Sequence, residues 1–167
     1  MKLYSAWYCP FAQRAWHALL QQCIGFEQIE VDPHNKREQW LSISRQTGQV
    51  PVVNLADADG SDLTVVDSNR IVEFLDNAYP RDIPLFSSSA SDQVEQKYWI
   101  DTVGSQIIPY FYRFLKTSEL GDYQDQSRDK MIQGTMAFTR AMSPDGPYFS
   151  GEHFGAVDIA FIHSLTE

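Results

Sequence analysis

The sequence predicts an α/β domain with the element order βαβα-ββα, followed by an all-α helical domain. In residues 1–79, short apolar or alternating runs typical of strands lie between segments with helical spacing. Residues 92–167 show mainly helical spacing. Residues 80–91 contain two prolines and a run of serines, which indicates an irregular linker between the two domains. The element order of the first domain builds a four-stranded mixed sheet flanked by helices.

The first strand and the first helix enclose Cys9. A strand is expected over 2–6 and a helix over 10–23, whose apolar side chains recur at three- and four-residue steps. This apolar face consists of Ala12, Ala15, Trp16, Leu19, Leu20 and Cys23. Pro10 suits the first helical position, because its missing N–H would have no partner there. Cys9 is therefore expected at a helix N terminus, where free N–H groups and the helix dipole favour the reactive thiolate.

The remaining elements of the α/β domain follow from local patterns. They are a strand over 26–31, a helix over 35–43, two strands over 51–55 and 63–66, and a helix that starts after Asp67. The polar connector between the last two strands contains glycine, which favours a β-hairpin. Asp67 and Ser68 are residue types that cap helices, so they are expected at the start of the last helix.

The helical domain is expected to begin with a long amphipathic helix over 94–115, which Pro109 bends near its centre. A second helix is expected over 126–141, and a third begins at Gly155. The sequence ends at Glu167 within this last helical pattern, so we expect an incomplete, truncated helical domain.

The composition narrows the classes of function. The chain has 167 residues and a net charge of −9, without a Lys/Arg cluster that would neutralise phosphates, which argues against nucleic-acid binding. No apolar run approaches the ~18 residues of a membrane span, and the N terminus lacks the pattern of a secretory leader, so a cytoplasmic protein is expected. Two cysteines are too few for a disulfide scaffold, and the scattered histidines lack ligand spacing, so no metal site is expected.

Several segments resemble, in the expected order, the omega class of the glutathione S-transferase family. The run Leu-Tyr-Ser-Ala-Trp-Tyr-Cys-Pro-Phe-Ala-Gln-Arg at 3–14 is similar to the first strand and active-site turn of that class. The other matching segments are 35–36 before Trp40, 49–53, 67–71, 98–101, 108–112 and 154–158, the last similar to the family's folding cap. The resemblance implies a thioredoxin-like fold for 1–79, a cis peptide before Pro51, glutathione as co-substrate or cofactor, and a homodimer.

The resemblance assigns the chemistry to Cys9, as a nucleophile that forms a mixed disulfide with glutathione. The alternative is an inert core cysteine, because free cysteine is often buried. The residue three positions on is Ala12, so a dithiol cycle is excluded and glutathione must complete the exchange. Cys23 would lie ~20 Å along the helix from Cys9, at about 1.5 Å per residue, and is expected in the core.

The resemblance also gives residues for a glutathione site and an acceptor pocket. The glutathione site comprises Phe11, Lys36, Val50, Pro51, Asp67 and Ser68, and the acceptor pocket comprises Pro10, Phe11 and Tyr112. Structural alternatives stay open, with Lys36 as a solvated lysine, Pro51 as an edge-strand proline and Asp67 as a plain helix cap.

The resulting hypothesis is an enzyme, a glutathione-dependent thiol transferase or reductase that acts on mixed disulfides, small disulfides or dehydroascorbate. Two alternatives stay open: a non-catalytic glutathione-binding regulatory protein of the same fold, and a conjugating transferase that acts on electrophiles. Many members of the family activate glutathione with a tyrosine or serine hydroxyl, which makes Tyr4 and Tyr8 rival candidates. A glutathione-dependent isomerase of the zeta class is disfavoured, because the serine-rich motif of that class is missing.

Overall fold

The computed structural model describes residues 1–35, 38–56, 62–116 and 121–162. The chain forms two compact units, Met1–Asp82 and Ile83–Glu167. In the described residues, the N-terminal unit contains the sheet and three helices, and the second, helical unit contains the other helices. The division falls within residues 80–91, the segment in which a linker is expected.

The N-terminal unit has a four-stranded mixed sheet with the strand order β2-β1-β3-β4. Its strands are β1 (Lys2–Ser5), β2 (Glu27–Glu30), β3 (Val52–Ala56) and β4 (Asp62–Val66). β1 pairs in parallel with β2 and in antiparallel with β3, and β3 pairs in antiparallel with β4. The predicted βαβα-ββα order, the hairpin and the mixed sheet are therefore confirmed.

The central strands of this sheet carry its core, whereas β2 lies at the edge. Leu3 in β1 and both Val52 and Val53 in β3 are fully buried. In β2 only Ile29 is even half-buried. The strand predicted over 26–31 thus has only a half-buried face, because an edge strand has a neighbour on one side alone.

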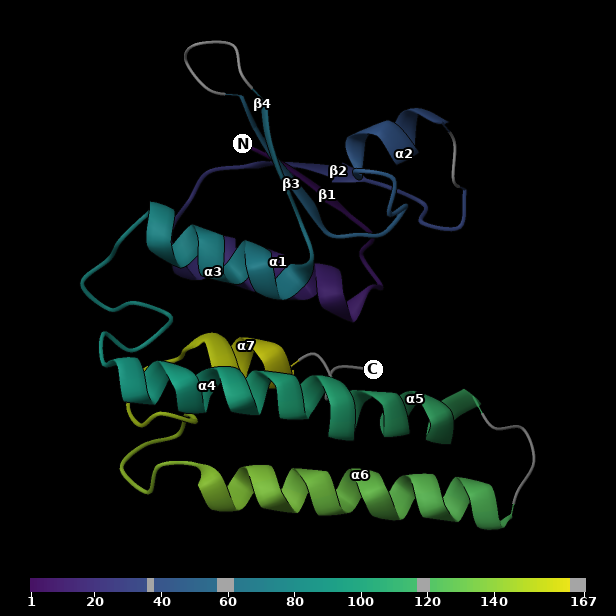
Figure 1. Cartoon of the computed structure of the whole chain (residues 1–167), viewed down its shortest axis with the longest axis vertical. Helices are drawn as coiled ribbons and strands as arrows, with labels where there is room; N and C mark the ends of the chain where they lie inside the picture. The colour runs from purple at the N-terminus through teal and green to yellow at the C-terminus, as the bar shows by residue number, and fades with distance from the viewer. Residues whose placement is uncertain (36–37, 57–61, 117–120, 163–167) are drawn as a thin grey trace. The chain divides into compact units, whose positions relative to one another are not determined.

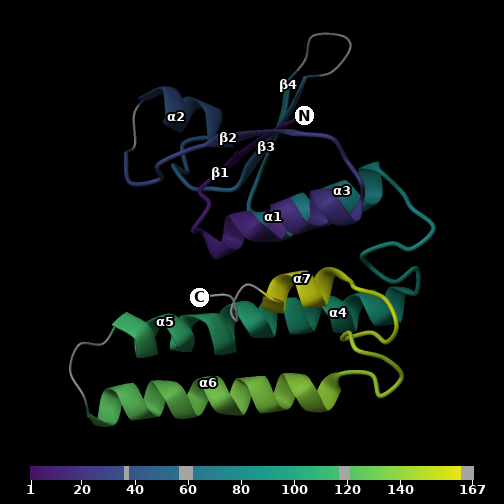
Figure 2. The ribbon, with the colours of Figure 1, turned by 180° about the vertical axis from the view of Figure 1, so that it is seen from behind.

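Two helices pack side by side next to the sheet. Figures 1 and 2 show α1 (Pro10–Gln21) and α3 (Ser68–Ala78) adjacent to each other and apart from the short helix α2 (Glu38–Ile43). The buried residues of α1 are mostly small, and they are Ala12, Arg14, Ala15, Ala18 and Leu19. Small side chains let α1 approach its neighbours closely, so the two helices and the sheet form one layered unit.

The prediction of the apolar face of the first helix was wrong at three positions. Trp16 and Leu20 are 39% and 50% exposed, and Cys23, expected in the core, is also exposed. The alanine stripe faces the interior, which turns Trp16 and Leu20 outward. Cys23 lies beyond the end of α1 with a left-handed φ of 52°, so it no longer follows the helical face.

The helical unit begins with a long helical run interrupted just before Pro109. The run consists of α4 (Ala90–Thr102), the π-helical turn η1 (Val103–Ile107) and α5 (Ile108–Lys116). Proline lacks an N–H, and its ring clashes with the carbonyl four residues earlier in a regular α-helix, here that of Ser105. A wider π-turn relieves that clash, so the irregularity expected at Pro109 lies in the turn that precedes it.

Two further helices complete this unit, α6 (Asp122–Ala141) and α7 (Ala156–Ile162). Figure 1 shows α6 running alongside α4 and α5. Asp158 fixes the start of α7, because its carboxylate accepts the N–H of Gly155 at 2.9 Å and that of Phe149 at 2.8 Å. Burial raises the pKa of Asp158, and these two hydrogen bonds oppose the shift. Segment 154–158, which resembles a folding cap in the sequence, therefore does cap α7 in the structure.

Helix α6 approaches the π-turn closely at Gly134, which leads to a prediction. A Cβ on Gly134 would lie 3.0 Å from Ile107 Cγ1 and 3.1 Å from the carbonyl oxygen of Gln106. We expect Gly134→Ala to lower the free energy of unfolding by about 1 kcal/mol, because the overpacking cost exceeds the helix propensity that alanine adds. Urea unfolding measures this change.

The matched control for this prediction is Gly104→Ala in the π-turn itself. A Cβ on Gly104 would meet no described atom within 4 Å. This variant should keep or raise the stability of the protein. Equal stabilisation by both substitutions would contradict the close approach of α6 to η1.

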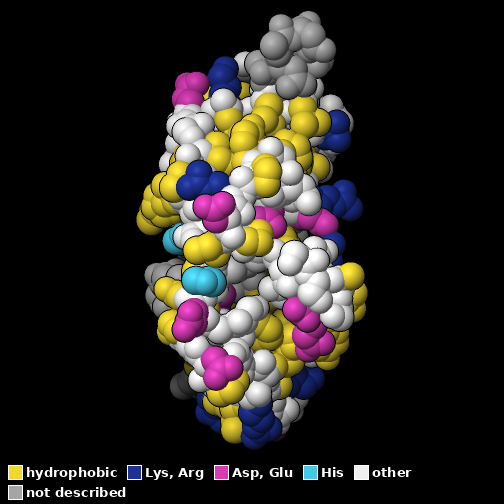
Figure 3. All heavy atoms as spheres, turned by 90° about the vertical axis from the view of Figure 1, so that its left-hand side faces the viewer, with side chains coloured by type: hydrophobic (Ala, Val, Ile, Leu, Met, Phe, Trp, Pro, Cys, Tyr) yellow, Lys and Arg dark blue, Asp and Glu magenta, His cyan; other side chains and the backbone are white. Residues whose placement is uncertain are grey.

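The surface and the helix lengths bear on the classes of partner. On the face shown in Figure 3, acidic and basic side chains are interspersed with hydrophobic ones. Among the helices that the structure describes, none has the length and apolar character needed to cross a membrane. Within the same residues, no group of three or more His, Cys, Asp or Glu side chains is arranged to hold a metal ion.

Candidate functional site

Cys9 occupies the N-cap position of α1. Its backbone is extended, with φ −87° and ψ 115°, and Pro10 follows as the first helical residue. The N–H of Cys9 donates to the Ala6 carbonyl at 2.9 Å, and its carbonyl accepts the N–H of Gln13 at 3.1 Å. The thiol is partly exposed, makes no capping hydrogen bond and is not in a disulfide. The backbone of Cys9 is thus fixed, and the residue that carries the sulfur lies at the N-terminal end of a helix.

Cys9 lies on the wall of a pocket in the N-terminal unit with a volume of about 720 Å³. Four segments line the pocket: the start of α1, the loop after β2, the loop before β3, and the turn from β4 into α3. Its lining residues are Cys9, Phe11, Pro33, His34, Thr47, Gly48, Gln49, Val50, Pro51, Val66, Asp67, Ser68 and Arg70. A pocket of this size is large enough for a small-molecule ligand.

The structure places most, but not all, of the expected site residues at this pocket. The residues brought together there are Cys9, Phe11, Val50, Pro51, Asp67 and Ser68. Pro10 is not among the described residues that line it. Lys36 lies outside the described residues, and Tyr112 belongs to α5 of the helical unit. The roles expected for these three residues stay predictions.

The loop before β3 presents Val50 to the pocket. The peptide between Val50 and Pro51 is cis, as expected. Ser44, fully buried, fixes the preceding loop, because its hydroxyl accepts the N–H of Gly48 at 3.0 Å and donates to the carbonyl of Trp40 at 2.8 Å. Within the described part of the chain, no hydrogen bond engages the N–H or the carbonyl of Val50. An extended peptide in the pocket would find an unpaired donor and acceptor there.

Asp67 and Ser68 form the start of α3. Asp67 is its N-cap, and its Oδ1 accepts the N–H groups of Asn69 at 3.0 Å and Arg70 at 3.2 Å. The predicted cap is therefore confirmed. Asp67 has a positive φ of 76°, an uncommon conformation for a residue other than glycine. The Oδ2 atom of Asp67 has no hydrogen-bond partner among the described residues, and Ser68 is 6% exposed at the pocket wall.

Arg14 is a buried cation that the sequence analysis did not assign to the site. Only 2% of its surface is exposed, and its Nη1 donates to Asn69 Oδ1 at 2.8 Å, which connects α1 with the start of α3. Burial lowers the pKa of Arg14 to about 10, while the negative charges of Asp67 and Cys9 oppose the shift. The signal in the sequence was the helical spacing from Arg14 to Ala18, which places the arginine on the buried face.

The structure also bears on the rival hydroxyl groups, those of Tyr4 and Tyr8. Tyr4 packs against Trp40 with a centroid distance of 5.8 Å. Neither Tyr4 nor Tyr8 is among the described residues that line the pocket. Desolvation and nearby negative charges, Asp32 first, raise the pKa of Tyr8, which disfavours a tyrosinate. The pocket residues that the sequence analysis did not assign to the site are Pro33, His34, Thr47, Gly48, Gln49, Val66 and Arg70.

The chain is similar in sequence to a known family and to several known proteins. Residues 3–83 match the family model described as glutathione S-transferase, N-terminal domain. The chain is 28% identical over 157 residues to the probable glutathione S-transferase DHAR1, cytosolic, of Oryza sativa subsp. japonica. This match covers 94% of this chain and 65% of that protein. It is also 28% identical over 154 residues to the probable glutathione transferase omega-2 of Caenorhabditis elegans, covering 90% of this chain and 57% of that protein.

A solved structure extends the similarity to both units. The crystal structure of glutathione transferase Omega 3C from Trametes versicolor matches with a TM-score of 0.81 and 31% sequence identity. The match covers 95% of this chain and 65% of that one. The chain thus spans less than two thirds of the length of each of these three proteins.

Proposed function

Residues 3–83 form a glutathione S-transferase N-terminal domain, and from that premise we propose that this protein is a glutathione-dependent thiol transferase with Cys9 as its nucleophile. One observation carries the proposal: the Cys9 thiol, without a hydrogen-bond partner among the described residues, lies in the same pocket as Val50, Asp67 and Ser68. The pocket therefore combines a nucleophile with groups that suit a small peptide.

In the proposed complex, glutathione lies extended across this pocket. The N–H and carbonyl of Val50 pair with the cysteinyl residue of glutathione, which directs its sulfur to Cys9. The hydroxyl and the N–H of Ser68, at the start of α3, receive the γ-glutamyl carboxylate, and Asp67 Oδ2 receives the ammonium group. Lys36 is proposed to bind the glycine carboxylate. Phe11 flanks the reacting sulfur and belongs to the acceptor side together with Pro10 and Tyr112.

The proposed chemistry proceeds in two exchange steps. The Cys9 thiolate attacks the glutathione sulfur of a mixed disulfide, so a Cys9–glutathione disulfide forms and the other thiol leaves as its thiolate. A second glutathione thiolate then attacks the glutathione sulfur of that adduct, which restores the Cys9 thiolate and yields glutathione disulfide. The two steps balance, because each mixed disulfide consumes one added glutathione, releases one substrate thiol and gives one glutathione disulfide, whose second half comes from the substrate. Relatives named for the omega class support this assignment over conjugation.

Trapping the intermediate tests the proposed function. Incubation of the protein with glutathione disulfide should give a single glutathione adduct, which peptide mass spectrometry assigns to Cys9. Addition of reduced glutathione should release this adduct and sustain turnover of a mixed-disulfide substrate. Retention on immobilised glutathione without adduct or turnover would instead support a binding protein. Consumption of an electrophile such as 1-chloro-2,4-dinitrobenzene without an adduct would support a conjugating transferase.

A further inference from the structure

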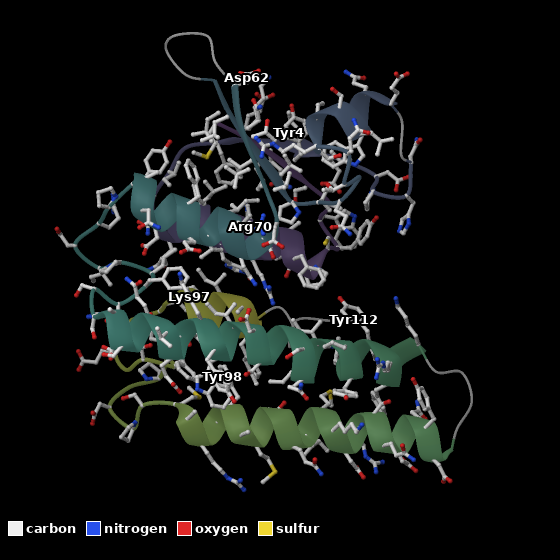
Figure 4. The ribbon with its side chains drawn as sticks, viewed as in Figure 1. Tyr4, Asp62, Arg70, Lys97, Tyr98 and Tyr112 are labelled. Carbon is white, nitrogen blue, oxygen red and sulfur yellow. The ribbon has the colours of Figure 1, made fainter. Side chains whose placement is uncertain are left out.

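We propose that Arg70 binds the γ-glutamyl carboxylate of glutathione and, together with Asp67, selects ligands with a zwitterionic amino-acid end. The inference rests on the proposed function and adds a residue that no sequence motif assigned to the site. Figure 4 shows Arg70 at the start of α3, where the chain arrives from β4.

Arg70 supplies a permanent positive charge to the part of the pocket wall that the structure describes. Among the described residues that line the pocket, Asp67 and Arg70 carry charges of opposite sign near neutral pH, and Cys9 and His34 are also titratable. The other nearby arginine, Arg14, is buried and donates to Asn69. Arg70 is exposed, and no hydrogen bond or ion pair engages its guanidinium within the described part of the chain. Its charge is therefore free to meet a ligand.

The backbone holds Arg70 and Asp67 in one arrangement. The N–H of Arg70 donates to Asp67 Oδ1 at 3.2 Å, so both residues belong to the same capped turn. That hydrogen bond and the one from Asn69 occupy Oδ1 and leave Oδ2 open. The same turn thus contributes both an acidic and a basic residue to the pocket lining, with Ser68 between them in the sequence.

Charge balance favours this role for Arg70. A ligand carboxylate at the start of α3 would meet the negative charge of Asp67 and a protein of net charge −9. The helix N terminus and Ser68 offset that repulsion in part, because a helix end carries about half a positive charge. A guanidinium adds a full charge and a two-pronged donor that matches a carboxylate. The α-amino acid end of glutathione, with one ammonium and one carboxylate, complements the Asp67 and Arg70 pair.

Calorimetric titration with S-methylglutathione, which cannot form a disulfide, tests this role. Arg70→Gln should weaken binding about fivefold, because Arg70 is partly solvated and its ion pair is of intermediate strength. Arg70→Lys, which keeps the charge, should recover part of the affinity. Arg81→Gln is the matched control, since it removes the same charge from the same unit outside the pocket. It should bind like the native protein.

A modified ligand separates a direct contact from a structural effect. Native protein should bind S-methylglutathione more weakly when the γ-glutamyl carboxylate of this ligand is converted to an amide. The factor by which the amide weakens binding should be about fivefold smaller for Arg70→Gln than for native protein. The difference between native protein and Arg70→Gln should also shrink in 1 M salt, where screening acts over ~3 Å. Equal discrimination by both proteins, or identical affinities of Arg70→Gln and Arg81→Gln, would overturn the role of Arg70. Absence of S-methylglutathione binding by native protein would overturn the proposed function and, with it, this inference.

Discussion

Replacing Cys9 by serine will reduce thiol transfer from a glutathione mixed disulfide to less than a tenth of the native rate. A hydroxyl is not appreciably ionised near neutral pH and cannot form a disulfide, so neither exchange step remains. Initial rates of disulfide reduction at saturating glutathione measure the effect. The pocket walls contributed by Val50 and Ser68 are unchanged, so S-methylglutathione should still bind to this variant.

The protein provides its own control for this experiment. Cys23 is an exposed free thiol beyond the end of α1 and is not among the pocket-lining residues that the structure describes. Cys23→Ser should therefore keep the native rate. A Cys9→Ser variant with more than a tenth of the native rate would contradict the assignment. Loss of thiol transfer with undiminished conjugation of electrophiles would point to hydroxyl activation of glutathione.

Replacing Arg14 by methionine is expected to reduce thiol transfer about tenfold, with a much smaller effect on stability. The Arg14 charge interacts favourably with those of Cys9 and Asp67, and its hydrogen bond to Asn69 connects α1 with α3. Loss of about 1.4 kcal/mol of such stabilisation corresponds to a tenfold slower step. Burial lowers the pKa of Arg14 to about 10, so keeping its charge in the interior has a cost that methionine removes. Steady-state kinetics and urea unfolding measure the two effects.

The dependence of rate on pH distinguishes a positioning role for Arg14 from a purely structural one. Without the positive charge, the thiolate is less favoured, so the rise of the rate with pH should move to higher pH. Arg14→Lys should restore most of this profile, although it lacks the planar donor group that meets Asn69. Native kinetics in Arg14→Met would exclude this role. So would a loss of stability in Arg14→Met if the protein that remains folded shows the native dependence of rate on pH.

Local signals account for the elements that the sequence predicted well. Pro10 sets the start of α1, Asp67 caps α3, and glycine in a polar connector marks the hairpin. Each of these signals acts through the backbone of a few neighbouring residues, so it survives without knowledge of the rest of the chain. Boundaries were less accurate, as at α6, which begins at Asp122 rather than near 126.

Assembly of the site depends on contacts between distant segments. The expected residues Cys9, Val50 and Asp67 converge on one pocket, an arrangement that the family resemblance implied. The sequence analysis assigned neither His34 nor Arg70 to the site, and their place at the pocket became visible only when four separate segments were brought together. Sequence spacing describes neighbours along one element, and it contains no information on which loops meet at the edge of a sheet.

The sequence by itself determined the order of strands and helices in the N-terminal unit and the position of Cys9 at a helix N terminus, because hydrophobic period, proline and capping residues act locally. Only the tertiary structure decided which side chains of α1 face the interior. Packing against the sheet and α3 selected the alanines and Arg14 for burial and turned Trp16 and Leu20 outward. Close approach of the elements favours small residues over large apolar ones, and a buried guanidinium is tolerated where Asn69 accepts its hydrogen bond.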